Sequence, residues 1–173
     1  MTSFRVDVLT EDDWPRLRDI RLIALEGDPP RFLSRHETEV EFDESQWRLE
    51  FSRGEWNVMV AHGRGAGNPG EGTRDVGLVG VTRESGMPSQ ECYLEYLWVA
   101  RGFRRSGVAS LLLRTVLDRL RDSGVRTVWL WILTGNDPAL RLYKQFGFRS
   151  TNERQALPGD PTRSEERMKL PLS

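Results

Sequence analysis

The 173-residue sequence predicts an α/β protein, with a central mixed β-sheet of six to seven strands and about four helices on its two faces. Two observations lead to this prediction. Segments with the two-residue period of strands alternate with segments of helical period, in the order β-α-α-β-β-β-α-β-α-β-β. Residues 126–133 ("RTVWLWIL") are apolar on both faces, which is typical of a strand buried between two layers. The length suits one domain, residues 1–173, with a single core.

The first third of the chain is predicted to form one strand and two helices. Residues 4–9 alternate apolar and polar side chains, as a strand with one buried face does. Thr10 and Asp13 resemble a capping box, and the apolar residues that follow recur at helical spacing. Residues 28–42 are predicted to be an irregular, charged connection before a second helix over residues 43–53, capped by its first residue.

The rest of the chain alternates strands with two further helices. The predicted strands cover residues 55–62, 75–83, 91–99, 126–133, a segment from about 147, and 164–172, and the predicted helices end near Asp122 and at Gly147. The first two of these strands flank a glycine-rich hairpin loop, and a proline-rich loop precedes the last one. Residues 91–133 form a strand–helix–strand unit, which we expect to be a right-handed parallel crossover.

Composition excludes several classes of function. A formal net charge of −1 provides no overall basic field for nucleic acid. No apolar run approaches the roughly 20 residues of a membrane span, and the N-terminus lacks a signal-peptide pattern. One cysteine excludes an internal disulfide, and two histidines at unrelated places without a CxxC pair predict no metal site. We therefore expect a cytoplasmic catalytic or cofactor-binding domain.

A basic, glycine-containing turn, "VARGFRRSGVAS" (residues 99–110), joins a buried strand to a helix. The first N–H groups of a helix lack partners and its dipole is positive there, so such a turn can bind an anion. Gly107 and Ala109 would let a phosphate approach the backbone, and Arg101, Arg104 and Arg105 add positive charge. Taken alone, the turn is equally consistent with a solvated connection.

A second motif, "TGNDPALRLYKQFGF" (residues 134–148), again follows a strand and opens a helix. Together the two motifs resemble the GNAT superfamily of acetyl-CoA-dependent N-acetyltransferases. Arg104, Gly107 and Ala109 match the family's pattern Arg/Gln-x-x-Gly-x-Gly/Ala. The family's later pattern, Asn-x-x-Ala-x-x-x-Tyr-x-x-x-Gly-Phe, is matched by Asn136, Ala139, Tyr143, Gly147 and Phe148. The resemblance is strong over residues 91–150 and implies the family's central mixed sheet.

The resemblance also implies which residues hold acetyl-CoA. The turn that would bind the CoA pyrophosphate consists of Arg104, Arg105, Ser106, Gly107, Val108 and Ala109. The strand edge that would bind the pantetheine arm consists of Leu97, Trp98 and Val99. Asn136 would meet the pantetheine or the neighbouring backbone, and Lys144 or Arg141 would approach the 3′-phosphate, unless these two helix-surface cations are simply solvated.

Acetyl transfer to an amine needs a base, because an alkyl amine with a reference pKa near 10.4 is mostly protonated at pH 7. Glu95 is the first candidate, since a carboxylate inside "YLEYLWV" is costly to bury and burial would raise its pKa. Glu91 on the same strand face is the second candidate and a water route the third, and Glu95 could instead face solvent or pair with an arginine.

The other catalytic assignments follow from the family resemblance. It implies Tyr143 as the general acid for the leaving thiolate, with a packed core tyrosine as the alternative. A backbone N–H near Trp98 and Val99 would polarise the thioester carbonyl. Attack is expected to be direct, through a tetrahedral intermediate, because Cys92 has no histidine partner in the sequence and is expected to be a small core residue.

The acceptor site in this family is shaped by the first two helices, their connection and late loops, which correspond to residues 25–42, 63–74 and 152–163. The acidic excess in the first of these segments suits a cationic amine, or is only a solvated face. We expect a small-molecule primary amine as acceptor. A protein or peptide amine and a non-catalytic CoA-binding module remain as alternatives, and a homodimer through sheet edges is compatible with the sequence.

Overall fold

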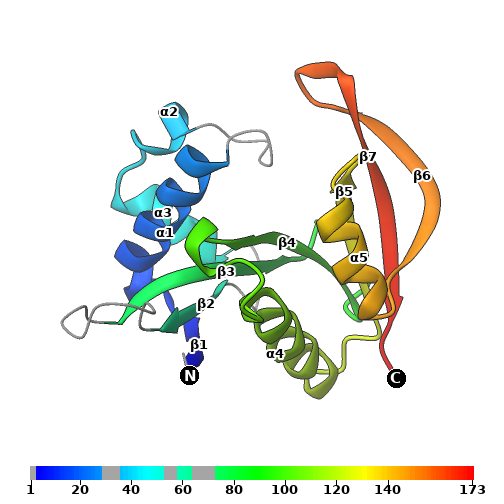
Figure 1. The fold of residues 1–173 in the computed structure, drawn as a ribbon, viewed down its shortest axis with the longest axis horizontal. Helices are drawn as coiled ribbons and strands as arrows, with labels where there is room; N and C mark the ends of the chain where they lie inside the picture. Colours follow the sequence, from blue (N-terminus) through cyan, green and yellow to red (C-terminus); the bar gives the residue numbers. More distant parts are fainter. Residues whose placement is uncertain (1–2, 29–35, 53–57, 64–72) are drawn as a thin grey trace.

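A computed structural model describes residues 3–28, 36–52, 58–63 and 73–173 of the protein. They form a seven-stranded mixed sheet in the order β1-β2-β3-β4-β5-β7-β6, with α-helices on both faces, which confirms the predicted α/β class (Figure 1). The strands are β1 (Phe4–Leu9), β2 (Val58–Gly63), β3 (Arg74–Thr82), β4 (Glu91–Val99), β5 (Thr127–Leu133), β6 (Arg149–Leu157) and β7 (Asp160–Pro171). The helices are α1 (Trp14–Gly27), α2 (His36–Glu39), α3 (Glu44–Ser52), α4 (Val108–Asp122) and α5 (Asp137–Gln145), with 3-10 turns η1 (Glu11–Asp13) and η3 (Arg101–Phe103).

The predicted crossover is present, because β4 and β5 pair in parallel and α4 connects them. The other strand pairs described are antiparallel. Both predicted caps are also confirmed: the backbone N–H of Thr10 donates to the Asp13 carboxylate (2.9 Å), and the N–H of Gln46 donates to Asp43 Oδ1 (2.9 Å). The local pattern of polar residues therefore sets where η1 and α3 begin.

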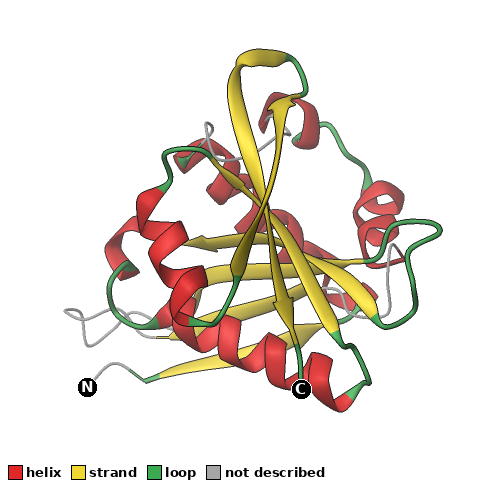
Figure 2. Ribbon diagram, turned by 90° about the vertical axis from the view of Figure 1, so that its right-hand side faces the viewer, coloured by secondary structure: helices red, strands yellow, loops and turns green. Residues whose placement is uncertain are grey.

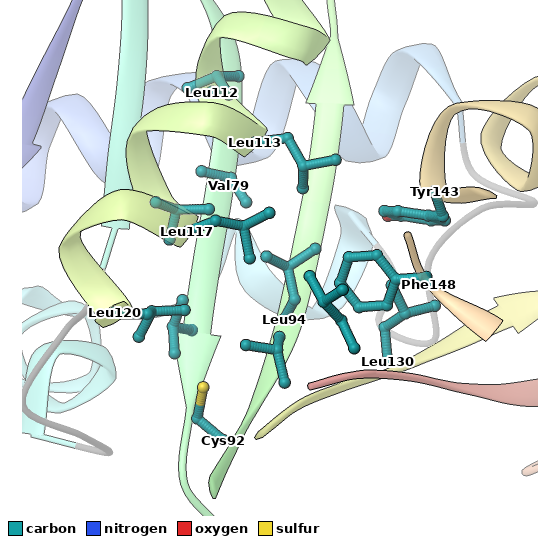
Figure 3. Packing of buried hydrophobic residues seen from close by; sticks show 14 of the residues in the cluster. Val79, Cys92, Leu94, Leu112, Leu113, Leu117, Leu120, Leu130, Tyr143 and Phe148 are labelled. Carbon is teal, nitrogen blue, oxygen red and sulfur yellow. The ribbon is translucent and has the colours of Figure 1, made fainter. Parts of the chain in front are cut away.

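Two hydrophobic clusters lie on opposite faces of the sheet. The larger one packs α4 and α5 against the strands, and Figure 3 shows Leu112, Leu113 and Leu117 of α4 facing Val79 and Leu94. The smaller one packs α1 and α3 on the other face, and its buried members include Leu17, Ile20, Trp47, Leu78 and Trp98. Figure 1 accordingly shows α1, α2 and α3 on one side of β3 and β4 and α4 on the other.

Two segments predicted to be irregular contain regular structure. Residues 36–39 form the single turn α2, and much of the predicted loop 152–163 belongs to the long hairpin of β6 and β7, which projects from the molecule in Figure 2. This hairpin is stabilised by polar cross-strand pairs instead of an apolar alternation. Arg154 pairs with Glu166 (3.5 Å), and Gln155 Nε2 donates to Glu165 (2.6 Å). Such polar strands lack the periodic signal from which a strand is predicted.

The expectation that β5 is buried on both faces was wrong. Val128, Leu130 and Ile132 are buried, whereas Trp129 and Trp131 are only half-buried. The β7 cations cover this second face: the Arg167 guanidinium carbon lies 4.0 Å from the Trp129 ring centroid, and Lys169 Nζ lies 5.1 Å from it. Arginine and lysine side chains thus take the place of a second hydrophobic layer.

Strands β4 and β5 pair over only part of their length. Their register runs from Glu91 opposite Thr127 to Tyr93 opposite Trp129, and no later residue of β4 pairs with β5. The β3 edge of β4 stays paired as far as Val99. The two central strands therefore diverge at their carboxyl ends, and the β5-facing backbone edge of residues 94–99 has no strand partner within the part of the chain that the structure describes.

Gly77 of β3 lets α4 approach the sheet closely. A Cβ at this position would lie 2.8 Å from Val108 Cγ1 and 2.9 Å from Leu112 Cδ1, and both side chains are buried. We expect Gly77→Ala to lower the free energy of unfolding by about 1–3 kcal/mol, because a packed core resists an added methyl group. Urea denaturation would measure this loss. Gly102→Ala is the control, since a Cβ there meets no atom within 4 Å, and equal stability of the two variants would contradict the expectation.

Candidate active site

The carboxyl ends of β4 and β5 lie at the same edge of the sheet, because the two strands run parallel. The turn after β4 leads into α4, and the turn after β5 leads into α5. The fold thus places both sequence motifs at the edge where the two strands diverge. The predicted pyrophosphate turn is the first of these connections, and the predicted catalytic tyrosine lies in α5, the helix that follows the second.

Strand β4 contains a bulge at Tyr96, whose φ of 59° is left-handed. Glu95 pairs with Gly80 and Trp98 with Leu78, so two residues of β4 face one of β3. The bulge reverses which side chains face α4. Cys92 and Leu94 before it and Val99 after it belong to the α4 cluster, whereas Trp98 belongs to the α1 and α3 cluster. Without the extra residue, Val99 and Leu94 would lie on opposite faces.

The turn before α4 is exposed and carries two left-handed residues, Arg105 (φ 61°) and Gly107 (φ 89°). A Cβ at Gly107 would meet no atom within 4 Å, so the backbone is open there. Ser106 is exposed and its hydroxyl donates to the Phe103 carbonyl, Val108 is buried, and Ala109 is half-buried. The first N–H groups of α4 therefore open onto an accessible, positively charged turn, as an anion site requires.

Arg104 does not point freely into this turn. Its Nε donates to the Val99 carbonyl (3.0 Å), and its NH2 group pairs with the buried carboxylate of Asp28. Asp28 also accepts a hydrogen bond from Trp98 Nε1 (2.9 Å), and Arg101 donates to the Gly27 carbonyl (2.8 Å). Asp28 thus ties the end of α1 to both β4 and the turn, a role that sequence reasoning missed because its partners lie 70 and 76 residues away.

The predicted residues of α5 separate into one buried side chain and several exposed ones. Asn136 is half-buried at the N-cap and its side chain makes no capping hydrogen bond. Arg141 and Lys144 are exposed. These positions agree with solvent-facing contacts to a nucleotide, and their assignment to acetyl-CoA stays a prediction.

Tyr143 is buried, with its ring 5.5 Å from the Phe148 ring in an edge-to-face contact. In Figure 3 its ring extends from α5 toward β4, near Leu94 and Leu113. No residue in the described ranges hydrogen bonds its hydroxyl. Burial raises the pKa of Tyr143 well above its ordinary value. The hydroxyl therefore stays protonated at neutral pH, as a proton donor must.

Glu95 lies half-buried directly before the bulge. The Thr82 hydroxyl donates to its Oε1 (3.3 Å). The pKa of the neighbouring Tyr96 is raised, first by burial and then by the negative charge of Glu95. Glu91 lies on the same strand face, as expected, but its Oε2 accepts a hydrogen bond from Trp129 Nε1 (2.7 Å). The two carboxylates thus differ in their hydrogen-bond partners, and the assignment of either as the base stays a prediction.

Cys92 is buried, as expected of a core residue, and burial raises the pKa of its thiol to about 12. A thiol in this state is a poor nucleophile at neutral pH. The described residues contain no group of three or more His, Cys, Asp or Glu side chains placed to hold a metal ion. Within those same ranges, the helices are too short or too polar to cross a membrane.

Arg104→Ala is expected to raise the dissociation constant of acetyl-CoA roughly tenfold, because it removes a charge from the predicted pyrophosphate turn and two bonds that hold the turn. Isothermal titration calorimetry at two salt concentrations would measure the change. Added salt should weaken wild-type binding more than binding by the variant. Arg119→Ala, at the far end of α4, is the control, and equal affinity of wild type and Arg104→Ala would remove Arg104 from the site.

Comparisons with known proteins agree with this architecture. A sequence model of the Acetyltransferase (GNAT) family matches residues 14–148. The uncharacterized N-acetyltransferase YdgE of Bacillus subtilis is 23% identical over 159 residues, which cover 88% of this chain and 96% of that protein. A putative acetyltransferase structure from Acinetobacter baylyi superposes with a TM-score of 0.78 at 16% identity, over 99% of this chain and 93% of that one.

A second solved structure with the same fold has a named protein substrate. It is the ribosomal-protein-S18-alanine N-acetyltransferase of Escherichia coli, with a TM-score of 0.67 at 19% identity over 99% of this chain and 95% of that one. These low identities show the fold alone, whereas the family model covers most of the chain. The protein described by these strands, turns and motifs belongs to the acetyltransferase (GNAT) family.

Proposed function

We propose that this acetyltransferase moves the acetyl group of acetyl-CoA to the primary amine of a small molecule. The observation that carries the proposal is the divergence of β4 and β5 after Tyr93 and Trp129. Among the described residues, it leaves a backbone edge of β4 without a strand partner, and this edge lies between the open turn before α4 and the buried Tyr143. Extended pantetheine can bind such an edge as an added strand would, with its pyrophosphate at the turn.

Glu95 is proposed to take a proton from the acceptor ammonium, directly or through water. The free amine then attacks the thioester carbonyl carbon, and a C–N bond forms while the carbonyl oxygen becomes an oxyanion near the Trp98 and Val99 backbone. Collapse of the tetrahedral intermediate breaks the C–S bond, and Tyr143 protonates the departing thiolate. The nitrogen gives up its second proton through water to the tyrosinate, which restores Tyr143, and Glu95 releases the proton that it took to solvent. The products are an amide and CoA.

The face that carries Glu95 is suited to a cationic acceptor. The negative charges of Glu95 and of Glu50 from α3 both act on Tyr96, so two carboxylates lie near the bulge. A local negative field raises the concentration of ammonium-bearing molecules at the site. A peptide or protein amine is the second candidate, because a structure that superposes over 99% of the chain is named as acting on a ribosomal protein.

A thiol-release assay with a panel of small amines and short peptides tests the proposal, with acetyl-, propionyl- and succinyl-CoA as donors. We expect thiol release that depends on a small amine and is fastest with acetyl-CoA. Turnover with peptides alone would replace the small-molecule acceptor by a peptide. Tight acetyl-CoA binding in calorimetry without any thiol release would identify a CoA-binding module instead of an enzyme.

A further inference from the structure

A buried ion pair joins α1 to α2 on the Glu95 side of the sheet. Arg21 Nε and NH2 donate to the two carboxylate oxygens of Glu39, at 3.0 and 2.9 Å, and the two side chains are only 10% and 7% exposed. Removing two charges from water is costly, and a hydrophobic pair of similar size often stabilises a protein as well or better. The pair is therefore poorly explained by stability alone.

The guanidinium of this pair lies against the bulge of β4. Its central carbon is 4.4 Å from the centroid of the Tyr96 ring, a cation–π contact. Tyr96 is the left-handed residue of the bulge and directly follows Glu95. An aromatic residue rarely adopts a positive φ, so surrounding contacts must hold it there.

The charged groups that face Tyr96 come from several elements. Arg21 faces it from α1 and Glu50 from α3, and Glu95 is its neighbour on β4. Glu39 of α2 acts on it through Arg21, and β3 contributes the neutral Thr82 hydroxyl to Glu95. Among these described groups Arg21 is a cation, and the negative charge of Glu39 lies directly beside it.

We propose that Arg21 and Glu39 are positioning residues for the catalytic base: they hold Tyr96 in the bulge and balance the charge that Glu95 experiences. The proposal rests on the proposed function, in which Glu95 is the base. It assigns a role to α2, a single helical turn that is otherwise remote from the sequence motifs. In the proposed mechanism neither residue touches the reacting atoms.

Two substitutions separate this role from a purely structural one, because they change the charge in opposite directions. Glu39→Gln keeps the size of the side chain but removes one negative charge beside Arg21, which favours the ionised form of Glu95. Arg21→Met removes the cation, which disfavours that form. We expect the acid limb of the pH profile of kcat/KM for the amine to move to lower pH in Glu39→Gln and to higher pH in Arg21→Met, by about 0.5 to 1 in pH each.

Both variants should also lower kcat by about tenfold, because a displaced base loses alignment with the amine. The dissociation constant of acetyl-CoA should stay within about twofold of wild type, since the pyrophosphate turn lies elsewhere. Asp19→Asn is the matched control: it removes the exposed pair between Asp19 and Arg18 on the same helix and should leave the profile unchanged. Unfolding temperatures of all the variants would show that they are folded.

A readout that does not need turnover keeps the two proposals separable. In ligand-free protein labelled with ¹³C at the glutamate carboxyls, the Glu95 signal, identified by its loss in Glu95→Gln, is titrated in wild type and both variants. Opposite shifts of its midpoint would support the positioning role even if wild type acetylates no amine, a result that would refute only the proposed function. Folded variants with an unmoved midpoint and unmoved kcat/KM profile would overturn the positioning role.

Discussion

Replacing Tyr143 by phenylalanine is expected to lower kcat by about 100-fold or more, the usual contribution of a positioned general acid. The buried hydroxyl has a raised pKa and is the proton donor proposed for the leaving thiolate. The phenylalanine ring preserves the edge-to-face contact with Phe148, so the fold should be kept. Steady-state kinetics would show a fall in kcat with little change in the affinity for acetyl-CoA.

The pH dependence of wild type provides a second test of Tyr143. Burial raises its pKa, so the hydroxyl should not ionise below about pH 10, the ordinary range of tyrosine. The rate should therefore not fall through loss of this proton at mildly alkaline pH. Tyr93→Phe, the same change on a tyrosine of β4 before the bulge, is the control. Unchanged turnover of Tyr143→Phe would show a core tyrosine without a catalytic role.

Glu95→Gln is expected to lower kcat/KM for the amine by roughly 100-fold at pH 7, because most of the acceptor is protonated at that pH and the variant cannot remove the proton. Activity should recover as the pH rises toward the pKa of the amine, since the free amine then needs no base. In wild type, kcat/KM falls at low pH as the Glu95 carboxylate becomes protonated, and this fall should be absent from the Glu95→Gln profile. A pH series of kcat/KM would measure both effects.

Glu91→Gln discriminates between the two candidate carboxylates. The Glu91 carboxylate accepts a hydrogen bond from Trp129, whereas Glu95 lies beside the bulge. A smaller loss in Glu91→Gln than in Glu95→Gln is therefore expected. The reverse order would transfer the role of base to Glu91, and full activity of both variants would leave water as the proton acceptor.

Much of the fold followed from local patterns. The alternation in residues 4–9, the capping residues Thr10 and Asp43 and the apolar stripe of α4 each involve residues that are close in sequence. The two glycine-containing turns could be placed for the same reason, and with them the edge of the sheet at which acetyl-CoA is expected. Polar strands such as β6 were not predicted in full, because cross-strand ion pairs stabilise them without any periodic signal.

The candidate site was only partly predictable. Glu95 and Tyr143 could be named from their position in a strand and in a motif, but the left-handed Tyr96 could not. Nothing in "YLEYLWV" indicates a bulge, since tyrosine has no preference for a positive φ. The same holds for the half-buried Trp129 and Trp131, whose second face is covered by cations of β7, a strand more than 30 residues later.

The sequence by itself determined the order of the strands and longer helices, the family and the turn expected to receive the CoA pyrophosphate, because helix periods, caps and glycine motifs depend on neighbouring residues. Only the tertiary structure decided that β4 and β5 diverge after Tyr93, that Asp28 holds Arg104, and that Arg21, paired with Glu39, packs against Tyr96. These features are contacts between residues of different elements, so they stabilise the protein only after the sheet has brought those elements together.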